Sequence, residues 1–164
     1  MSTQENLKTA FAGESQANRK YLAFSQKAQQ EGLLNVGRLF EAIAEAETIH
    51  ALKHLQNMQV VGSTLENLKE AAKGEQYEFE AMYPDFIVEA RQEGNKEAER
   101  SFHLANEAEK VHHQLYQKAV QAVEAGKDFP AQQFYLCPVC GYVGEEAPDR
   151  CPICGAKNSS FKKY

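Results

Sequence analysis

The sequence predicts an all-α four-helix bundle followed by a small carboxyl-terminal domain rich in cysteine. Residues 3 to about 125 are rich in Ala, Glu, Gln, Lys and Leu, which favour helices, and contain very few Gly or Pro. All four cysteines lie within residues 137–154 as two CxxC pairs. The bundle also contains a repeat, because FEAIAEAETIH at residues 40–50 returns as FHLANEAEKVH at residues 102–112.

Four long helices account for the first region. Ser2 with Glu5, and Ser63 with Glu66, have the spacing of a capping box, which marks a helix start. Glycines mark the breaks between helices, at Gly32, Gly62, Gly94 and Gly126. The predicted helices span roughly residues 3–31, 33–61, 64–93 and 95–125. A helix of about 28 residues extends about 40 Å, a length that favours a bundle.

The composition changes abruptly after Gly126, where GKDFPAQQF has the character of a linker. We therefore predict a helical domain at residues 1–126, a linker at 127–133 and a very small second domain at 134–164.

Helical periodicity directs a carboxylate of each helix toward the core, and in the second and fourth helices a histidine follows three residues later. These inward-facing residues are Glu14 in the first helix, Glu47 and His50 in the second, Glu75 in the third, and Glu109 and His112 in the fourth. Lys and Arg are absent from the same stripes. A buried carboxylate without a partner costs several kcal/mol, so metal ions are the natural counter-charge.

The chemistry of these donors indicates the metal. A Glu and a His three residues apart can bind one ion, and a Glu from a facing helix can bridge two, so two ligand sets imply two metals. Oxygen and nitrogen donors without sulfur suit iron or manganese, and zinc is chemically possible. Exposed acids on solvated helices explain a lone ExxH equally well, but two copies with two paired Glu favour a metal site.

Other residues near these stripes carry less information. His54, His103 and His113 are not assigned as ligands, because a lone histidine is more often a satisfied core or surface residue. Tyr21 and Tyr116 share faces with the predicted ligands, either as hydrogen-bonding neighbours of the carboxylates or as core packing.

The carboxyl-terminal domain contains two CPxCG units, Cys137 with Cys140 and Cys151 with Cys154. Four thiolates at this spacing predict one tetrahedral metal site, which a domain of about thirty residues needs in order to fold. A structural zinc ribbon and an iron tetrathiolate both fit the spacing. A redox-capable di-metal site on the same chain favours iron, with zinc as a possible substitute.

Charge and terminal sequence limit the partners. A net charge of −5, with Lys and Arg neither in excess nor clustered, argues against binding nucleic acid. The segment MSTQENLK is polar, and no window approaches the length of a membrane span, so a cytoplasmic protein with no membrane partner is expected.

Taken together, FAGESQANRKY, GEQYEFEAMYPDF, the two EAExxH helices and the CPxCG pair resemble the rubrerythrin family over essentially the whole chain. The resemblance implies a ferritin-like di-iron bundle followed by a rubredoxin-like domain with one iron. It also implies that Glu47 and Glu109 bridge the two iron ions. Glu78, which periodicity leaves beside the stripe, is implied as a further ligand that exchanges with His50 as the oxidation state changes.

The resemblance implies an enzyme that reduces hydrogen peroxide to water in oxidative-stress defence. Electrons would pass through the cysteine-bound iron from an external, NAD(P)H-linked reductase. It further implies a homodimer or higher homo-oligomer in which the small domain of one subunit serves the partner, and a bundle of about 40 Å makes delivery within one chain unfavourable. Two alternatives are a ferroxidase or iron storage and detoxification protein, and a non-catalytic zinc-ribbon module on a helical scaffold.

Overall fold

The computed structural model describes residues 2–164, so that Met1, the first residue of the predicted helical domain, lies outside the described part. Its helical elements are α1 (Thr3–Gln30), α2 (Leu34–Met58), α3 (Thr64–Tyr77), the π-helical segment η1 (Glu78–Met82), α4 (Tyr83–Gln92) and α5 (Lys96–Glu124). Three short strands follow, β1 (Tyr135–Leu136), β2 (Val143–Gly144) and β3 (Lys162–Lys163), with a 3-10 turn η2 (Asn158–Ser160) before β3. Long helices followed by a small cysteine-rich sheet are therefore confirmed.

The chain packs as two compact units, Met1–Gly62 and Ser63–Tyr164. The second unit contains both α3–α5 and the small sheet, whereas the sequence suggested a division near residue 126. These two units are defined by contacts between residues, and they do not test the predicted boundaries at 126 and 134. Those boundaries stay predictions. Among residues 2–164, no helix combines the length and the apolar character needed to cross a membrane.

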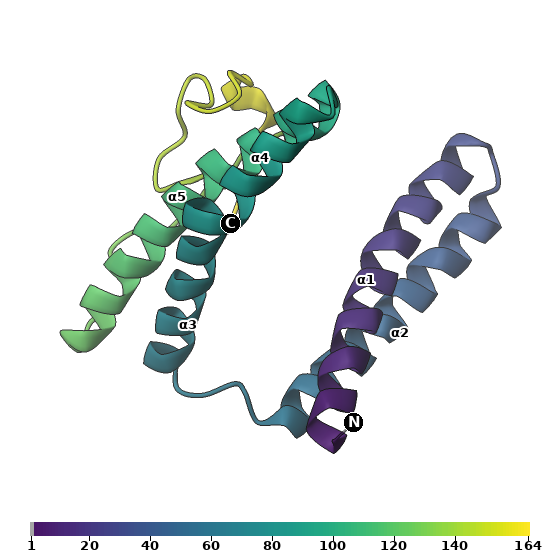
Figure 1. Ribbon diagram of the computed structural model, residues 1–164, viewed down its shortest axis with the longest axis horizontal. Helices are drawn as coiled ribbons and strands as arrows, with labels where there is room; N and C mark the ends of the chain where they lie inside the picture. Colours follow the sequence, from purple (N-terminus) through teal and green to yellow (C-terminus); the bar gives the residue numbers. More distant parts are fainter. Residues whose placement is uncertain (1) are drawn as a thin grey trace. The chain divides into compact units, whose positions relative to one another are not determined.

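The first unit is an antiparallel pair of helices, α1 and α2 (Figure 1). Small residues allow the close approach, since Ala44 and Ala51 are buried and a Cβ at Gly37 would lie 2.9 Å from Gln29 Cγ. The Asn18 side chain on α1 joins the two helices. Its Nδ2 donates to the Ala44 carbonyl at 2.7 Å and to Thr48 Oγ1 at 2.8 Å, both on α2. These contacts fix the register of the two helices around Glu14 and Glu47.

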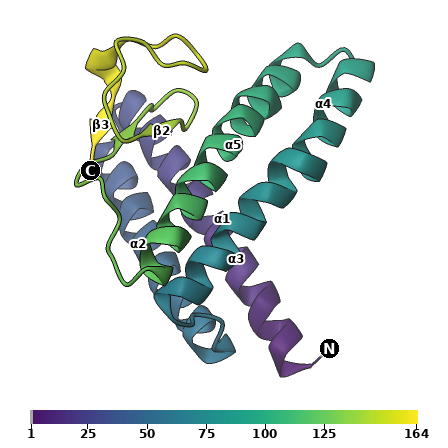
Figure 2. The ribbon, with the colours of Figure 1, turned by 90° about the vertical axis from the view of Figure 1, so that its left-hand side faces the viewer.

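In the second unit, α3, η1 and α4 run alongside α5 (Figure 2). His113 Nδ1 on α5 lies 2.7 Å from the Ala72 carbonyl oxygen on α3, and its ring packs against Phe79 at 5.5 Å. Phe102 on α5 packs against both Tyr83 and Phe86. His113 is therefore a satisfied packing residue, in line with its exclusion from the predicted ligands.

The helix ends follow the predicted signals in most places. Ser2 with Glu5 and Ser63 with Glu66 both form capping boxes. Gly32 has φ of 80°, the left-handed conformation that glycine adopts at low cost after a helix. The second helix ends at Met58 rather than near residue 61, because Gln59 adopts a left-handed φ of 55° and terminates it early.

The third predicted helix is interrupted by η1. The Tyr83 N–H donates to the Glu78 carbonyl five residues earlier, so the turn holds one extra residue. Pro84 follows in the first turn of α4, and because proline has no N–H and its ring crowds the preceding turn, a regular α-helix cannot continue through it. The extra residue rotates the residues after the turn relative to Glu75.

The small sheet has the strand order β2-β1-β3 with both pairs antiparallel. Tyr135 pairs with Gly144 on one side and with Lys163 on the other. The segment between α5 and β1 brings this sheet back against α5, with which β2 makes direct contact. The sheet therefore lies beside α5 instead of beyond its end.

Replacing Asn18 with Ala should lower the free energy of unfolding by about 1–3 kcal/mol, because the Ala44 carbonyl and the Thr48 hydroxyl both lose a donor. Denaturation followed by circular dichroism measures the effect. The matched control is Asn57→Ala, an exposed position on α2 that should change the free energy by less than about 0.5 kcal/mol. Equal effects of the two substitutions would contradict the role given to Asn18.

Candidate metal centres

The first ligand set comes from α1 and α2. Glu14, Glu47 and His50 bring one ligand atom each to within 4.8 Å of one another. His50 Nδ1 lies 3.0 Å from Glu47 Oε2, and the Glu47 side chain is only 15% exposed. A hydrogen bond with Glu47 raises the pKa of Glu14, whereas the contacts with Glu14 and then His50 lower the pKa of Glu47. The two carboxyl groups thus contact each other in a way that a cation bound between them would favour.

The second set comes from α3 and α5 and is formed by Glu75, Glu109 and His112, again with ligand atoms within 4.8 Å. His112 Nδ1 lies 2.7 Å from Glu109 Oε2 and 3.7 Å from Glu75 Oε1. All three side chains are less than a quarter exposed. This set therefore gathers two carboxylates and an imidazole in a largely desolvated place.

The pKa values in the second set depend on burial and on the contacts among its three members. Burial, and then the hydrogen bond with Glu109, raise the pKa of Glu75 to about 7. Burial opposes ionisation of Glu109, but the contacts with His112 and Glu75 outweigh it and lower the pKa of Glu109. The hydrogen bond with Glu109 raises the pKa of His112. Crowding of Glu75 against Glu109 in a partly buried place fits a site whose positive charge comes from a metal ion.

Glu78 lies beside the second set. It is the first residue of η1, and no group of converging ligand atoms among residues 2–164 includes it. Burial and the charge of Glu109 raise its pKa, so its carboxyl group is within electrostatic reach of the set. The structure brings six of the seven predicted helical ligands into two sets, and the ligand role of Glu78 stays a prediction.

Two tyrosines adjoin the second set. Burial, followed by the charges of the nearby carboxylates, raises the pKa of both Tyr83 and Tyr116. Tyr83 was not identified from the sequence, because regular periodicity places Met82 on the inner stripe. The extra residue in η1 turns Tyr83 toward α5, and Pro84 was the signal that the periodicity would break. Tyr21 packs against Phe24 and Phe40, both at 6.2 Å.

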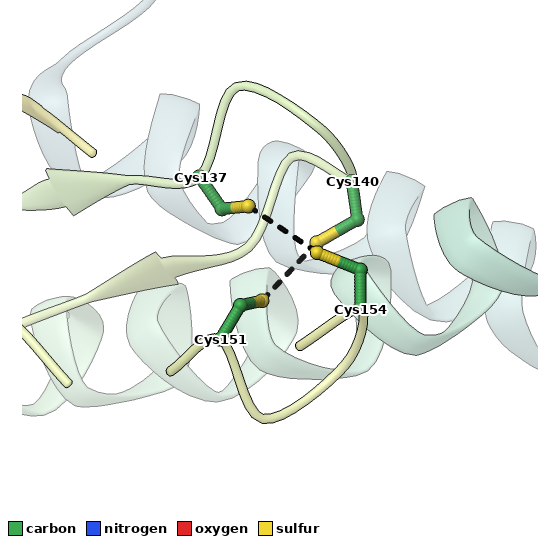
Figure 3. A group of neighbouring side chains, drawn as sticks. All are labelled: Cys137, Cys140, Cys151 and Cys154. Atoms are coloured by element: carbon green, nitrogen blue, oxygen red, sulfur yellow. Dashed lines mark hydrogen bonds between the residues drawn. The ribbon is translucent and has the colours of Figure 1, made fainter. Parts of the chain in front are cut away.

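The four cysteines converge from two loops of the small domain (Figure 3). The Sγ atoms of Cys137 and Cys154 are 3.5 Å apart, those of Cys140 and Cys151 are 3.4 Å apart, and all four lie within 4.8 Å. A tetrahedral ion with metal–sulfur bonds of about 2.3 Å needs sulfurs about 3.8 Å apart. The spacing of these thiols therefore fits one tetrahedral metal ion.

Backbone groups prepare the cysteine site for negative charge. Gly141 and Gly155 adopt left-handed conformations, with φ of 82° and 74°, and their N–H groups donate back to the carbonyls of Cys137 and Cys151. Burial opposes ionisation of Cys151, but the N–H groups of Cys154 and Ile153 outweigh it and lower its pKa to about 7. The second CxxCG turn thus aims backbone donors at the Cys151 sulfur, whereas burial raises the pKa of Cys140 and of Cys154.

One hydrogen bond joins the helical and cysteine sites. His112 Nε2 lies 2.8 Å from the Gly141 carbonyl oxygen, and Gly141 directly follows Cys140. The expectation that a bundle of this length makes delivery from its end unfavourable within one chain assumed a small domain beyond the helices, and the structure places this domain beside α5. The reason is that the chain turns back after α5 ends at Glu124, so the cysteine loop reaches the middle of the same helix.

Both parts of the chain match models of known families. Residues 5–120 match the model described as Rubrerythrin, and residues 135–162 match the one described as Rubrerythrin, rubredoxin-like domain. The chain belongs to the rubrerythrin family. Rubrerythrin-2 from Clostridium acetobutylicum is 40% identical to it, over 99% of this chain and 96% of that protein. Nigerythrin from Nitratidesulfovibrio vulgaris is 39% identical, over 99% of this chain and 87% of that protein.

Solved structures of the family agree with this result. Nigerythrin in a partially reduced state is 39% identical with a TM-score of 0.59, covering 100% of this chain and 87% of that one. Fully reduced, all-ferrous nigerythrin is 38% identical with a TM-score of 0.58 over the same shares. The predicted fold class, ferritin-like helices followed by a rubredoxin-like domain, is confirmed. The predicted cofactors are confirmed with it, since the chain has the Glu and His ligands of a di-iron protein and a four-cysteine iron knuckle.

Replacing Glu47 with Ala should reduce the bound iron by about one ion per chain, because the first set then loses its shared carboxylate. Iron analysis of the purified protein measures the loss, and the visible colour of the cysteine-bound iron should be unchanged. The matched control is Glu45→Ala, an exposed acid on the same helix that should leave the iron content unaltered. Unchanged iron content in Glu47→Ala would contradict the assignment.

In metal-free protein, Glu75 should make folding pH-dependent. Its folded-state pKa of about 7 exceeds the ordinary 4.5, so the folded chain keeps a proton that the unfolded chain releases between these values. Stability from this group therefore falls as the pH rises from about 4.5 to about 7. The variant Glu75→Gln lacks this loss, and we expect the gap between its melting temperature and that of wild type to widen by roughly 2–4 °C per kcal/mol over this range. Parallel curves would contradict the raised pKa.

Proposed function

We propose that this protein is a non-haem di-iron peroxidase that reduces hydrogen peroxide to water and so protects the cell from oxidative stress. The observation that carries the proposal is the hydrogen bond between His112 and the Gly141 carbonyl, which connects the helical ligands to the cysteine knuckle. A storage protein has no need of such a connection, whereas a reductase that must be resupplied with electrons does. Membership of the rubrerythrin family supports the same reading.

We assign the helical ligands as Glu14, Glu47, His50, Glu75, Glu78, Glu109 and His112, and the rubredoxin-like ligands as Cys137, Cys140, Cys151 and Cys154. Six of the helical residues support this assignment by converging in two sets. Glu78 is the additional carboxylate, whose position at the start of a π turn suits a side chain that changes its contacts. When iron is bound, its two ferrous ions supply the two electrons of the reaction H₂O₂ + 2 e⁻ + 2 H⁺ → 2 H₂O.

The protein supplies geometry and hydrogen bonds. His112 donates its Nε2–H to the Gly141 carbonyl, which leaves Nδ1 directed at Glu109 and Glu75 as the nitrogen that binds metal. Tyr83 and Tyr116 keep their phenolic protons at neutral pH, because burial and the nearby carboxylates raise their pKa values. These neutral phenols are hydrogen-bond donors in a site that otherwise consists of acceptors.

The path for electrons is short and lies within one chain. From Cys140 it follows one peptide unit to the Gly141 carbonyl and then the hydrogen bond to the imidazole of His112. An iron held by the four cysteines would carry one electron at a time, so two passages along this path would restore the pair used by each peroxide. We propose an external NAD(P)H-linked reductase as the source of these electrons, and a homo-oligomer as the working form.

Anaerobic stopped-flow absorbance tests the function. The protein is chemically reduced and mixed with hydrogen peroxide, and the colour of the ferric tetrathiolate is followed. We expect rapid appearance of that colour in wild type and in Glu45→Ala, and its loss in Glu47→Ala, because the cysteine site is oxidised through the helical site. Indifference to peroxide, with ready oxidation by oxygen and uptake of added ferrous iron, would instead establish the ferroxidase alternative.

A further inference from the structure

A second contact holds the cysteine domain against α5, away from any metal ligand. Lys118 Nζ on α5 donates to both carboxylate oxygens of Glu145, at 2.6 and 2.7 Å. The same ammonium group lies 5.4 Å from the centre of the Phe129 ring, in the segment that joins α5 to the sheet. The Lys118 side chain therefore contacts both the joining segment and the domain that follows it.

We infer that Lys118 is a positioning residue, which holds the cysteine domain in the place where the Gly141 carbonyl meets His112. This inference rests on the proposed function for its consequence, since the contact with His112 is the proposed route of electrons. Its structural part, that Lys118 keeps the cysteine loop docked, stands on the geometry alone.

The position of the contact explains why it controls orientation. Lys118 follows His112 by six residues, or about 9 Å along the helix, and Glu145 directly follows β2. Without Lys118, the hydrogen bond from His112 and the packing of β2 against α5 still hold the small domain. A further polar attachment about 9 Å from His112 restricts rotation of the domain about Gly141, because two polar contacts on α5 then fix its direction.

An apolar cavity adjoins the docked arrangement. It has a volume of about 390 Å³ and lies against His112, between the helices, the joining segment and the sheet. Phe129, which Lys118 contacts, is one of the side chains that line it. Losing the Lys118 contact would therefore loosen one side of this cavity, where water beside His112 would compete for the Gly141 carbonyl.

The expected strength of the contact sets the size of the effect. The Lys118 and Glu145 side chains are 45% and 31% exposed, so solvent screens their attraction. Pairs of this kind contribute up to about 1 kcal/mol, to which the ring contact adds a comparable amount. Loss of about 1 kcal/mol shifts the docking equilibrium about fivefold. A moderate, salt-sensitive effect is therefore expected, rather than loss of the fold.

The test compares iron-loaded, full-length wild type with Lys118→Met, Lys118→Arg and Glu145→Gln. The matched control is Lys27→Met, which removes an exposed ion pair with Glu31 on α1. Hydrogen–deuterium exchange at residues 137–146 reports docking without reference to activity. Stopped-flow oxidation of the tetrathiolate by peroxide reports electron passage, at low and at high salt.

We expect Glu145→Gln to speed exchange at residues 137–146 and to slow tetrathiolate oxidation by about fivefold, and Lys118→Met to have a larger effect because it also loses the contact with the Phe129 ring. Lys118→Arg and Lys27→Met should match wild type. High salt should slow oxidation in wild type and have less effect in Lys118→Met. Substituting each partner of the ion pair in turn distinguishes loss of the pair from an unrelated defect in one variant.

Two results would overturn the inference. One is exchange at residues 137–146 that stays at the wild-type rate in both Lys118→Met and Glu145→Gln. The other is faster exchange with no change in the oxidation rate, which would reduce Lys118 to a stabilising residue. If peroxide fails to oxidise wild type at all, the proposed function is wrong, and the exchange measurement alone then decides whether Lys118 docks the domain.

Discussion

The crowding of carboxyl groups on apolar helix faces is the constraint on which the rest of this structure depends. Each pair, Glu14 with Glu47 and Glu75 with Glu109, places like charges in contact, and without metal one member of each pair has a raised pKa. A histidine lies beside each pair, His50 at 3.0 Å from Glu47 and His112 at 2.7 Å from Glu109. Two metal ions supply the missing positive charge, so the same residues that destabilise a metal-free chain become the most favourable contacts in the loaded protein.

A second consequence concerns His112, which serves two sites at once. Its Nδ1 faces the carboxylates of the second set, while its Nε2 faces the carbonyl of the cysteine loop. An imidazole that must present a lone pair on one side and a proton on the other is held in a single tautomer by that carbonyl. Under the proposed assignment of His112 as a metal ligand, the placement of the small domain bears on the metal chemistry of the helices, and the joining segment after α5 brings the loop back to that residue.

The helices themselves were predictable because their capping residues, glycine ends and periodicity are all features of residues close together in the sequence. Both capping boxes and the helix ends at Gly32, Gly94 and Gly126 lie where the spacing placed them, and six predicted ligands converge because residues three and four apart share a helical face. The four cysteines converge for a similar reason, since a CxxCG turn fixes the directions of its two sulfurs whatever surrounds it. Periodicity failed only at η1, where one extra residue exchanges Met82 for Tyr83 on the inner face.

The sequence by itself thus determined the helices, the two kinds of metal ligand and their donor chemistry, because each depends on residues close together in the chain. The tertiary structure alone decided that the cysteine loop lies beside His112 on α5 of the same chain, and that Lys118 forms an ion pair with Glu145. These contacts join residues 27 to 29 positions apart through a segment with no regular structure, for which no periodicity exists. Only the folded path of that segment, set by packing of Phe129 and Phe134 against each other and around the cavity, selects which part of α5 the domain meets.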